Sequence, residues 1–221
     1  MFITLEGPEG SGKTSHIKPL AERLTILGYK VFTTREPGGT PIGEKIREVI
    51  HDLEHTDMHL RAETLLYQAT RAQLVEQVIR PKLRDGFIGI SDRYVDSTLV
   101  YQGYGYQQDL DEIRRLVNYA TGGLMPDLTI LLDIDVEIGL QRKLNSGEWN
   151  RLDAKEIDFH RRVREGYLRF AEAEPARWVV VDAGQSWEVV QGYMRDIVSK
   201  RIQELRAFAM SSVNPVQNVG G

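Results

Sequence analysis

Cysteine is absent from this 221-residue sequence, which excludes disulfide bonds and thiolate metal sites. No apolar run approaches the ~20 residues that a helix needs to cross a bilayer. The first ten residues, MFITLEGPEG, also lack the basic segment and the long apolar run of a signal peptide. We therefore expect no membrane partner and a cytoplasmic location, which the absence of cysteine also suits.

The sequence also has no excess of basic over acidic residues. The chain has 28 Lys and Arg against 32 Asp and Glu, a formal net charge of −4. Such a charge creates no global attraction to DNA or RNA, so we expect no polymeric nucleic-acid partner. The composition is that of an ordinary globular protein, with 41% hydrophobic and 27% charged residues. The length suits one domain with a sizeable core.

Five short apolar runs alternate with longer helical patterns along the chain. The runs cover residues 2–5, 30–34, 87–91, 128–134 and 178–181. They are rich in Val, Ile and Leu without strict polar alternation, which indicates strands buried on both faces. Right-handed crossovers then place helices on each side of the sheet. The pattern predicts an α/β fold with a five-stranded parallel sheet and helices on both faces.

The helical patterns lie between these runs. We expect helices over residues 13–27, 42–50, 60–80, 110–119, 136–144, 158–174 and 187–205, the third of them ended by Pro81. No internal repeat or linker divides the chain. We therefore expect one domain over residues 1–207, followed by a flexible tail over residues 208–221.

Residues 7–14, GPEGSGKT, fit the phosphate-binding pattern G-x-x-x-x-G-K-[ST] between a predicted strand and a predicted helix. The glycines let backbone N–H groups turn around phosphate oxygens, and the helix N-terminus adds partial positive charge. Lys13 can neutralise the β- and γ-phosphates, and the Thr14 hydroxyl can ligate Mg²⁺. The residues expected to bind ATP are Gly7, Pro8, Glu9, Gly10, Ser11, Gly12, Lys13 and Thr14.

The phosphate loop occurs in switch GTPases, in ATPases and in small-molecule kinases. The N-K-x-D sequence that reads guanine in the switch GTPases is absent. Arginines follow two predicted strands, Arg35 in TREPGGT and Arg93 in DRY, and guanidinium groups bind phosphate bidentately. This favours a kinase with an anionic acceptor. A kinase for another nucleotide or for a nucleoside, and a nucleotide-binding switch or regulatory ATPase, remain the alternatives.

A helical segment between the two arginine motifs carries Tyr67 and Arg71, four residues apart and so on one helix face. A ring and a guanidinium on one face could hold a nucleobase. Each residue also has a simpler interpretation: Arg35 as a surface ion pair with Glu36, Asp92 as a helix cap, and Tyr67 as a core residue.

The ordered set GPEGSGKT, TREPGGT, Y-x-A-x-R and DRY resembles the thymidylate kinases of bacteria, and the resemblance spans nearly the whole chain. It implies the fold of P-loop nucleoside-monophosphate kinases and the transfer of the γ-phosphate of ATP to dTMP. The products would be dTDP and ADP, on the route to dTTP. It also implies a homodimer and a Mg²⁺ ion that enters with ATP.

The resemblance assigns roles around the acceptor phosphate and sugar. Arg35 and Arg93 would bind the dTMP phosphate, and Glu9 would lie near the 3′-hydroxyl. Asp92 would lie near the reacting phosphates, where it would orient Arg93 or contact Mg²⁺ through water. Tyr101 would lie under the deoxyribose, leaving little room for a 2′-hydroxyl.

At the base, the resemblance places Tyr67 against the thymine ring, Arg71 on its O4 and Thr98 as a further polar contact. The loop over residues 182–186 would lie beside adenine.

Residues 141–153, QRKLNSGEWNRLD, form a polar segment with basic residues near both ends. The phosphate loop has Pro8 and Glu9 where an arginine could have stood, so the cation that stabilises the moving phosphoryl group should come from elsewhere. The resemblance identifies a lid over about residues 142–153, with Arg142 and Arg151 as catalytic residues. Related lids often have an acidic residue at the position of Asn150. The alternative is a solvated surface loop.

Overall fold

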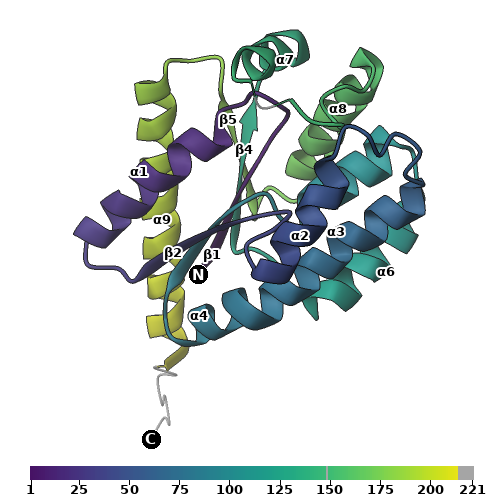
Figure 1. Cartoon of the computed structure of the whole chain (residues 1–221). Helices are drawn as coiled ribbons and strands as arrows, with labels where there is room; N and C mark the ends of the chain where they lie inside the picture. Colours follow the sequence, from purple (N-terminus) through teal and green to yellow (C-terminus); the bar gives the residue numbers. More distant parts are fainter. Residues whose placement is uncertain (148, 214–221) are drawn as a thin grey trace, which may run out of the picture.

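The computed structural model describes residues 1–147 and 149–213. A parallel five-stranded sheet in the order β2-β3-β1-β4-β5 forms its centre (Figure 1). The strands are β1 (Phe2–Glu6), β2 (Val31–Arg35), β3 (Ile88–Asp92), β4 (Leu128–Asp133) and β5 (Trp178–Asp182). The predicted sheet is confirmed, and each strand boundary lies within one residue of its predicted position.

Helices cover both faces of the sheet, as predicted (Figure 1). One face packs against α1 (Lys13–Ile26) and α9 (Trp187–Val213). The other face packs against a larger layer that includes α3 (Leu60–Leu74), α6 (Leu110–Thr121) and α8 (Ile157–Ala173). Because side chains alternate along a strand, β1 contributes Ile3 and Leu5 to the first core and Phe2 to the second.

Two further helices border the carboxyl edge of the sheet. The first, α2 (Pro41–His51), packs on α3 and begins at Thr40, whose hydroxyl accepts the N–H of Gly43 at 3.0 Å. The second, α7 (Val136–Asn145), follows β4 and lies beyond the end of that strand in Figure 1.

The third predicted helix does not end at Pro81, so that prediction was wrong. Instead α3 runs into a π-helical segment, η1 (Val75–Ile79), and then into α4 (Arg80–Arg84). Pro81 lies in the first turn of α4, where a residue needs no intrahelical acceptor for its N–H. The wider π turn before it changes the hydrogen-bonding pattern, and the proline is accommodated without ending the helical path.

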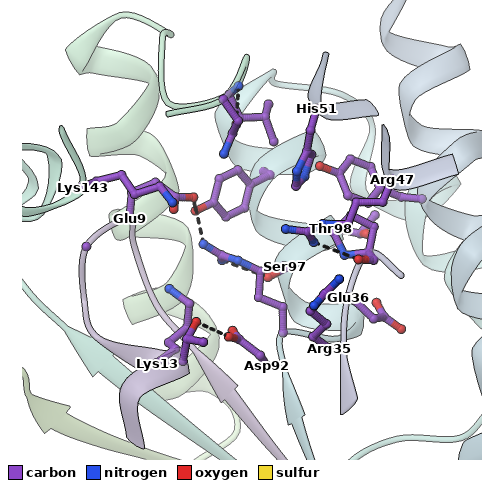
Figure 2. Close-up of a pocket in the computed structure, with 18 of the residues that line it drawn as sticks. Glu9, Lys13, Arg35, Glu36, Arg47, His51, Asp92, Ser97, Thr98 and Lys143 are labelled. Carbon is purple, nitrogen blue, oxygen red and sulfur yellow. Dashed lines mark hydrogen bonds and ion pairs between the residues drawn. The ribbon is translucent and has the colours of Figure 1, made fainter. Parts of the chain in front are cut away.

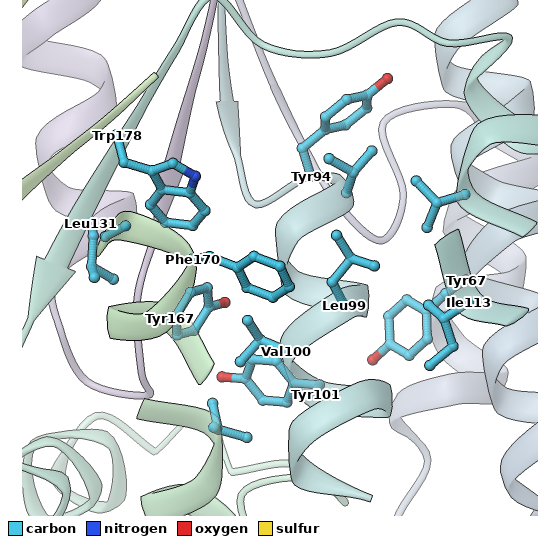
Figure 3. Close-up of a cluster of buried hydrophobic side chains, with 14 of the residues drawn as sticks. Tyr67, Tyr94, Leu99, Val100, Tyr101, Ile113, Leu131, Tyr167, Phe170 and Trp178 are labelled. Atoms are coloured by element: carbon cyan, nitrogen blue, oxygen red, sulfur yellow. The ribbon is translucent and has the colours of Figure 1, made fainter. Parts of the chain in front are cut away.

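A helical segment after β3 was not predicted. It consists of α5 (Val95–Thr98) and the π-helical η2 (Leu99–Gly105). Figure 3 shows Leu99, Val100 and Tyr101 of η2 packed beside Tyr167 and Phe170 of α8. A π-helical turn lacks the 3.6-residue periodicity by which helices are recognised in a sequence, so the pattern gave no signal here.

The last helix is longer than predicted and extends to Val213. Residues 208–213 of the predicted tail are therefore helical, whereas residues 214–221 lie outside the described part of the chain. Within residues 1–147 and 149–213, no helix is both long and apolar enough to span a bilayer.

Every strand ends at a charged residue on the carboxyl edge of the sheet: Glu6, Arg35, Asp92, Asp133 and Asp182. The register pairs Asp92 of β3 with Leu5 of β1 on one side and with Arg35 of β2 on the other. In parallel α/β sheets, ligands bind beyond this edge. The register thus brings the phosphate loop and both predicted arginine motifs together.

Candidate active site

The phosphate loop follows β1 and ends where α1 begins. Gly10 has a φ of 68°, and a Cβ on it would lie 1.9 Å from the carbonyl oxygen of Gly139 in α7. Only glycine fits such a position, because a side chain would be strained and would collide with backbone. Gly12, with a φ of 86°, caps α1.

Lys13 is buried within this loop. Its Nζ donates to the carbonyl oxygens of Gly7 at 3.0 Å and Pro8 at 2.9 Å, and to Oγ of Ser11 at 3.1 Å. Burial, and then the nearby Arg93 guanidinium, lowers the pKa of Lys13 to about 8. The ammonium group is therefore still mostly charged at neutral pH, as a partner for phosphate must be.

A cavity of about 470 Å³ extends from the phosphate loop to the ends of β2 and β3 (Figure 2). It brings together most of the residues that the sequence predicted for the site: Glu9, Gly10, Gly12, Lys13, Thr14, Arg35, Tyr67, Arg71, Asp92, Arg93, Thr98, Tyr101 and Arg142. The remaining predicted residues do not line the cavity. Gly7, Pro8 and Ser11 contact Lys13, and Arg151 lies apart.

At the loop end of the cavity, the Thr14 hydroxyl donates to Oδ2 of Asp92 at 2.6 Å. Figure 2 shows Asp92 beside Lys13. A hydroxyl and a carboxylate side by side next to Lys13 offer the hard oxygen atoms that Mg²⁺ prefers.

Arg93 lies between the phosphate loop and the part of the cavity beside β2 and α2. Its φ of 67° is unusual for a residue with a side chain, and its N–H donates to the carbonyl oxygen of Leu5 at 3.0 Å. Its guanidinium donates to the carbonyl oxygen of Gly7 at 3.1 Å and to Oε1 of Glu9 at 2.8 Å. Such backbone conformations cost roughly 1–3 kcal/mol and persist where the surroundings hold them.

Glu9 is ionised at neutral pH. Burial alone would raise its pKa, but the positive charges of Arg93 and Lys13 outweigh burial and lower the pKa to about 2. The Tyr101 hydroxyl donates to Oε1 of Glu9 at 2.6 Å, and the Arg93 guanidinium lies 5.0 Å above the Tyr101 ring. Loop, strand end and η2 thus meet around one carboxylate.

Arg35 and Arg47 bring further positive charge to the part of the cavity beside β2 and α2. Arg35 is exposed, and its guanidinium donates to Oε2 of Glu44 at 2.6 Å. Arg47 of α2 donates to the carbonyl oxygen of Pro37 at 2.9 Å, and its pKa is lowered by burial and then by Arg35. The smaller of these two effects is repulsion between the two cations, which an anion between them would relieve.

Arg71 is fully buried among acceptors. Its Nε and Nη2 both donate to Oε2 of Glu36, and Nη2 also donates to the carbonyl oxygen of Tyr94. Nη1 donates to Oε1 of Gln68 at 3.0 Å and to the Thr98 hydroxyl at 2.9 Å. All five N–H groups therefore have acceptors, and a base carbonyl can bind Arg71 only by replacing one of them.

The two lid arginines lie in different places. Arg142 of α7 lines the cavity, and its Nη1 donates at 3.0 Å to the carbonyl oxygen of Ala183, in the loop after β5. Arg151 is instead buried against α3, where it forms an ion pair with the fully buried Glu63 and donates to the carbonyl oxygen of Ile50 at 3.2 Å. The predicted catalytic role of Arg151 stays a prediction, and this arrangement does not place it at the cavity.

Comparison with known proteins gives a consistent result. The family model for thymidylate kinase matches residues 5–193. A thymidylate kinase of Roseiflexus sp. (strain RS-1) is 49% identical over 210 residues, covering 90% of this chain and 93% of that protein. One from Deinococcus radiodurans is 47% identical over 201 residues, covering 91% of this chain and 97% of that protein.

This chain belongs to the thymidylate kinase family. A crystal structure of the thymidylate kinase from Ehrlichia chaffeensis, 31% identical, superimposes with a TM-score of 0.72 and covers 90% of this chain and 98% of that one. The predicted family and fold class are thereby confirmed.

The family's motifs did not lead to every residue of the cavity. Arg47 and His51 of α2 both line it (Figure 2). Burial, and then the charge of Arg47, lowers the pKa of His51 to about 4, so its imidazole is neutral at pH 7. Arg47 follows TREPGGT by two helical turns. This position in the sequence only weakly predicts that Arg47 lines the cavity, because the rotation of α2 decides which of its residues face it.

We expect Arg151→Ala to lower the free energy of unfolding by about 3–5 kcal/mol, because it leaves the Glu63 carboxylate buried without its partner. The side chains of Arg151 and Glu63 are 7% and 0% exposed. Urea unfolding measures the change. Arg161→Ala is the control, since that arginine is exposed and pairs with Glu137 and Asp158 at the surface. A loss no larger than that of the control would contradict a structural ion pair.

Proposed function

We propose that this chain transfers the γ-phosphate of ATP to dTMP, giving dTDP and ADP. The charge of the cavity is the observation that supports two anionic substrates. Among its described lining residues, seven Lys and Arg side chains face three Asp and Glu side chains. These positive side chains repel one another unless anions bind between them. They extend from the phosphate loop to the ends of β2 and β3.

Donor binding is assigned to the phosphate loop. Backbone N–H groups at the start of α1 and the Lys13 ammonium would hold the phosphates of ATP. Within the described part of the chain, no group of three or more His, Asp and Glu side chains could hold a metal by itself. Thr14 and Asp92 fit a Mg²⁺ ion that takes its other ligands from phosphates and water, and that would neutralise charge on those phosphates.

Acceptor binding is assigned to the arginines beyond β2 and β3. Arg35 and Arg93 would hold the dTMP phosphate, and Arg47 would add to the same positive potential. A phosphate oxygen is already a nucleophile, so the reaction needs no general base. The chain would act by positioning the two phosphates and by stabilising charge on the transferred group.

The sugar and base would occupy the far part of the cavity. The ionised Glu9 can accept a hydrogen bond from the 3′-hydroxyl, and the Tyr101 ring would lie under the deoxyribose. Tyr67 would pack against thymine. Arg71 would bond O4 by exchanging the Thr98 contact of Nη1, and Thr98 would then be released to a polar atom of the base.

A panel of acceptors tests the proposed function. At a fixed ATP concentration, the rate of ADP release should be highest with dTMP, lower with dUMP and lowest with CMP or GMP. The thymine methyl group should be worth roughly 1 kcal/mol in an apolar niche, so discrimination against dUMP should be modest. Equal or faster turnover of CMP or GMP would contradict dTMP specificity, and ADP release independent of any acceptor would indicate an ATPase.

We propose that Arg142 is the arginine that stabilises the negative charge on the transferred phosphoryl group, because it already lines the cavity. Arg151 can serve only after its ion pair with Glu63 opens. At saturating ATP and dTMP, Arg142→Ala should lower kcat at least tenfold, since a supplied arginine can contribute ~10³-fold in such reactions. Steady-state kinetics of Arg142→Ala, Arg151→Ala and the control Arg161→Ala would separate the roles. A kcat lowered only in Arg151→Ala would assign the role to Arg151 instead.

We also propose a homodimer. The neighbouring helices α2 and α3 expose Ile42 (55%), Val49 (42%) and Leu65 (54%), and exposed apolar side chains on adjoining helices favour association. Leu65→Glu should shift the protein towards monomer in sedimentation velocity, whereas Ile26→Glu on α1 should leave the oligomeric state unchanged. A monomer before substitution would refute the proposal.

The cytoplasmic location predicted from the sequence stays a prediction.

A further inference from the structure

Glu6 is the last residue of β1 and is completely buried beneath the cavity. Side chains alternate along the strand, so Glu6 points to the same face as Phe2, towards η2 and α8. A fully buried carboxylate is expensive unless every lone pair it offers is used, which makes its contacts informative.

Three donors converge on this carboxylate. The N–H of Tyr94 donates to Oε1 at 2.8 Å, and the hydroxyls of Ser97 and Tyr167 donate to Oε2 at 2.6 and 2.9 Å. An ionised carboxylate can only accept hydrogen bonds. The two hydroxyl oxygens also lie 3.0 Å from each other. Only one of them can donate to the other, so at least one hydroxyl hydrogen points at the ionised Glu6, and that hydroxyl turns its lone pairs away from the carboxylate.

Those lone pairs meet Arg93. Its Nη1 donates to the Ser97 hydroxyl at 3.2 Å and to the Tyr167 hydroxyl at 3.1 Å. Figure 3 shows the Tyr167 hydroxyl in the aromatic cluster beside Tyr101, the ring over which the Arg93 guanidinium lies. An ionised Glu6 thus favours hydroxyl orientations whose lone pairs face Nη1 of Arg93, which also donates to the carbonyl oxygen of Gly7 at 3.1 Å.

We propose that Glu6 is a positioning residue, which holds the Arg93 guanidinium in the orientation that binds the acceptor phosphate by orienting the hydroxyls of Ser97 and Tyr167. The inference rests on the proposed function, because Arg93 binds the acceptor there. An arginine side chain has many rotamers, and fixing it before the substrate arrives removes that entropic cost from binding.

The protonation state of Glu6 matters for this arrangement. Burial, and then the charge of Asp96, raises the pKa of Glu6 to about 7, while Arg93 and the two hydroxyls oppose the shift. A protonated Glu6 would itself donate a hydrogen bond and could turn a hydroxyl hydrogen towards Arg93. Binding is therefore best measured at pH 8, where the carboxylate is ionised.

The test uses Glu6→Gln, Tyr167→Phe and Ser97→Ala in the full chain. Calorimetric titration at pH 8 measures the dissociation constants of dTMP and of a non-hydrolysable ATP analogue. Each variant should weaken dTMP binding roughly tenfold, the effect of losing a hydrogen bond to a charged group. Binding of the ATP analogue should stay within about twofold in Tyr167→Phe and Ser97→Ala, because these variants change no charge near Lys13, whose Nζ contacts Gly7, Pro8 and Ser11.

Two substitutions serve as matched controls. Thr121→Ala removes a buried hydroxyl whose hydrogen bond goes to the carbonyl oxygen of Val117, 2.9 Å away. Asp133→Asn removes a charge at the end of β4, where the carboxylate pairs with Arg164 at 2.8 Å. Both should lower stability without changing the affinity for dTMP. A purely structural Glu6 would instead behave like these controls, and that outcome would overturn the inference.

Arg93→Ala separates this inference from the proposed function. If Arg93→Ala leaves dTMP binding unchanged, the acceptor role of Arg93 fails and the inference fails with it. If Arg93→Ala weakens binding but Tyr167→Phe and Ser97→Ala do not, only the inference fails. Support requires that Tyr167→Phe cause no further loss in the Arg93→Ala background. The tyrosine variant decides the matter even if Glu6→Gln does not fold.

Discussion

The partly buried ion pair between Glu9 and Arg93 joins the two halves of the site. Glu9 belongs to the phosphate loop after β1, and Arg93 follows β3, so the pair spans neighbouring strands. Removing two charges from water is costly, and the site offsets that cost with close hydrogen bonds from Tyr101 to Glu9 and from Arg93 to Gly7. The pair therefore holds the phosphate loop and the end of β3 at one relative position.

Packing and electrostatics support one another beneath this pair. The segment formed by α5 and η2 packs apolar side chains against α8, and Tyr101 and Tyr167 are buried there, 4% and 0% exposed. In such a weakly polarisable setting a satisfied hydrogen bond is strong and an unsatisfied group is costly. The same core that stabilises the fold thus holds the polar groups of the site in place.

The motifs in the sequence predicted the fold and most of the cavity. Strands were recognisable because both of their faces are apolar, and GPEGSGKT, TREPGGT and DRY lie at strand ends, where parallel pairing brings them together. Lys13 and Thr14 followed from a loop whose chemistry is local. The sequence did not predict the π-helical turns of η1 and η2, because they have no distinctive periodicity. For this reason Pro81 was wrongly predicted to end a helix.

The sequence by itself determined which groups are available and on which strand ends they lie. Only the tertiary structure decided their partners: Arg151 with Glu63, Arg47 beside Arg35, and Glu6 beneath Arg93. Backbone pairing follows a repeating pattern that short segments can reveal. The partner of a side chain depends instead on helix rotation and on contacts between residues far apart in the chain, and no short motif encodes those.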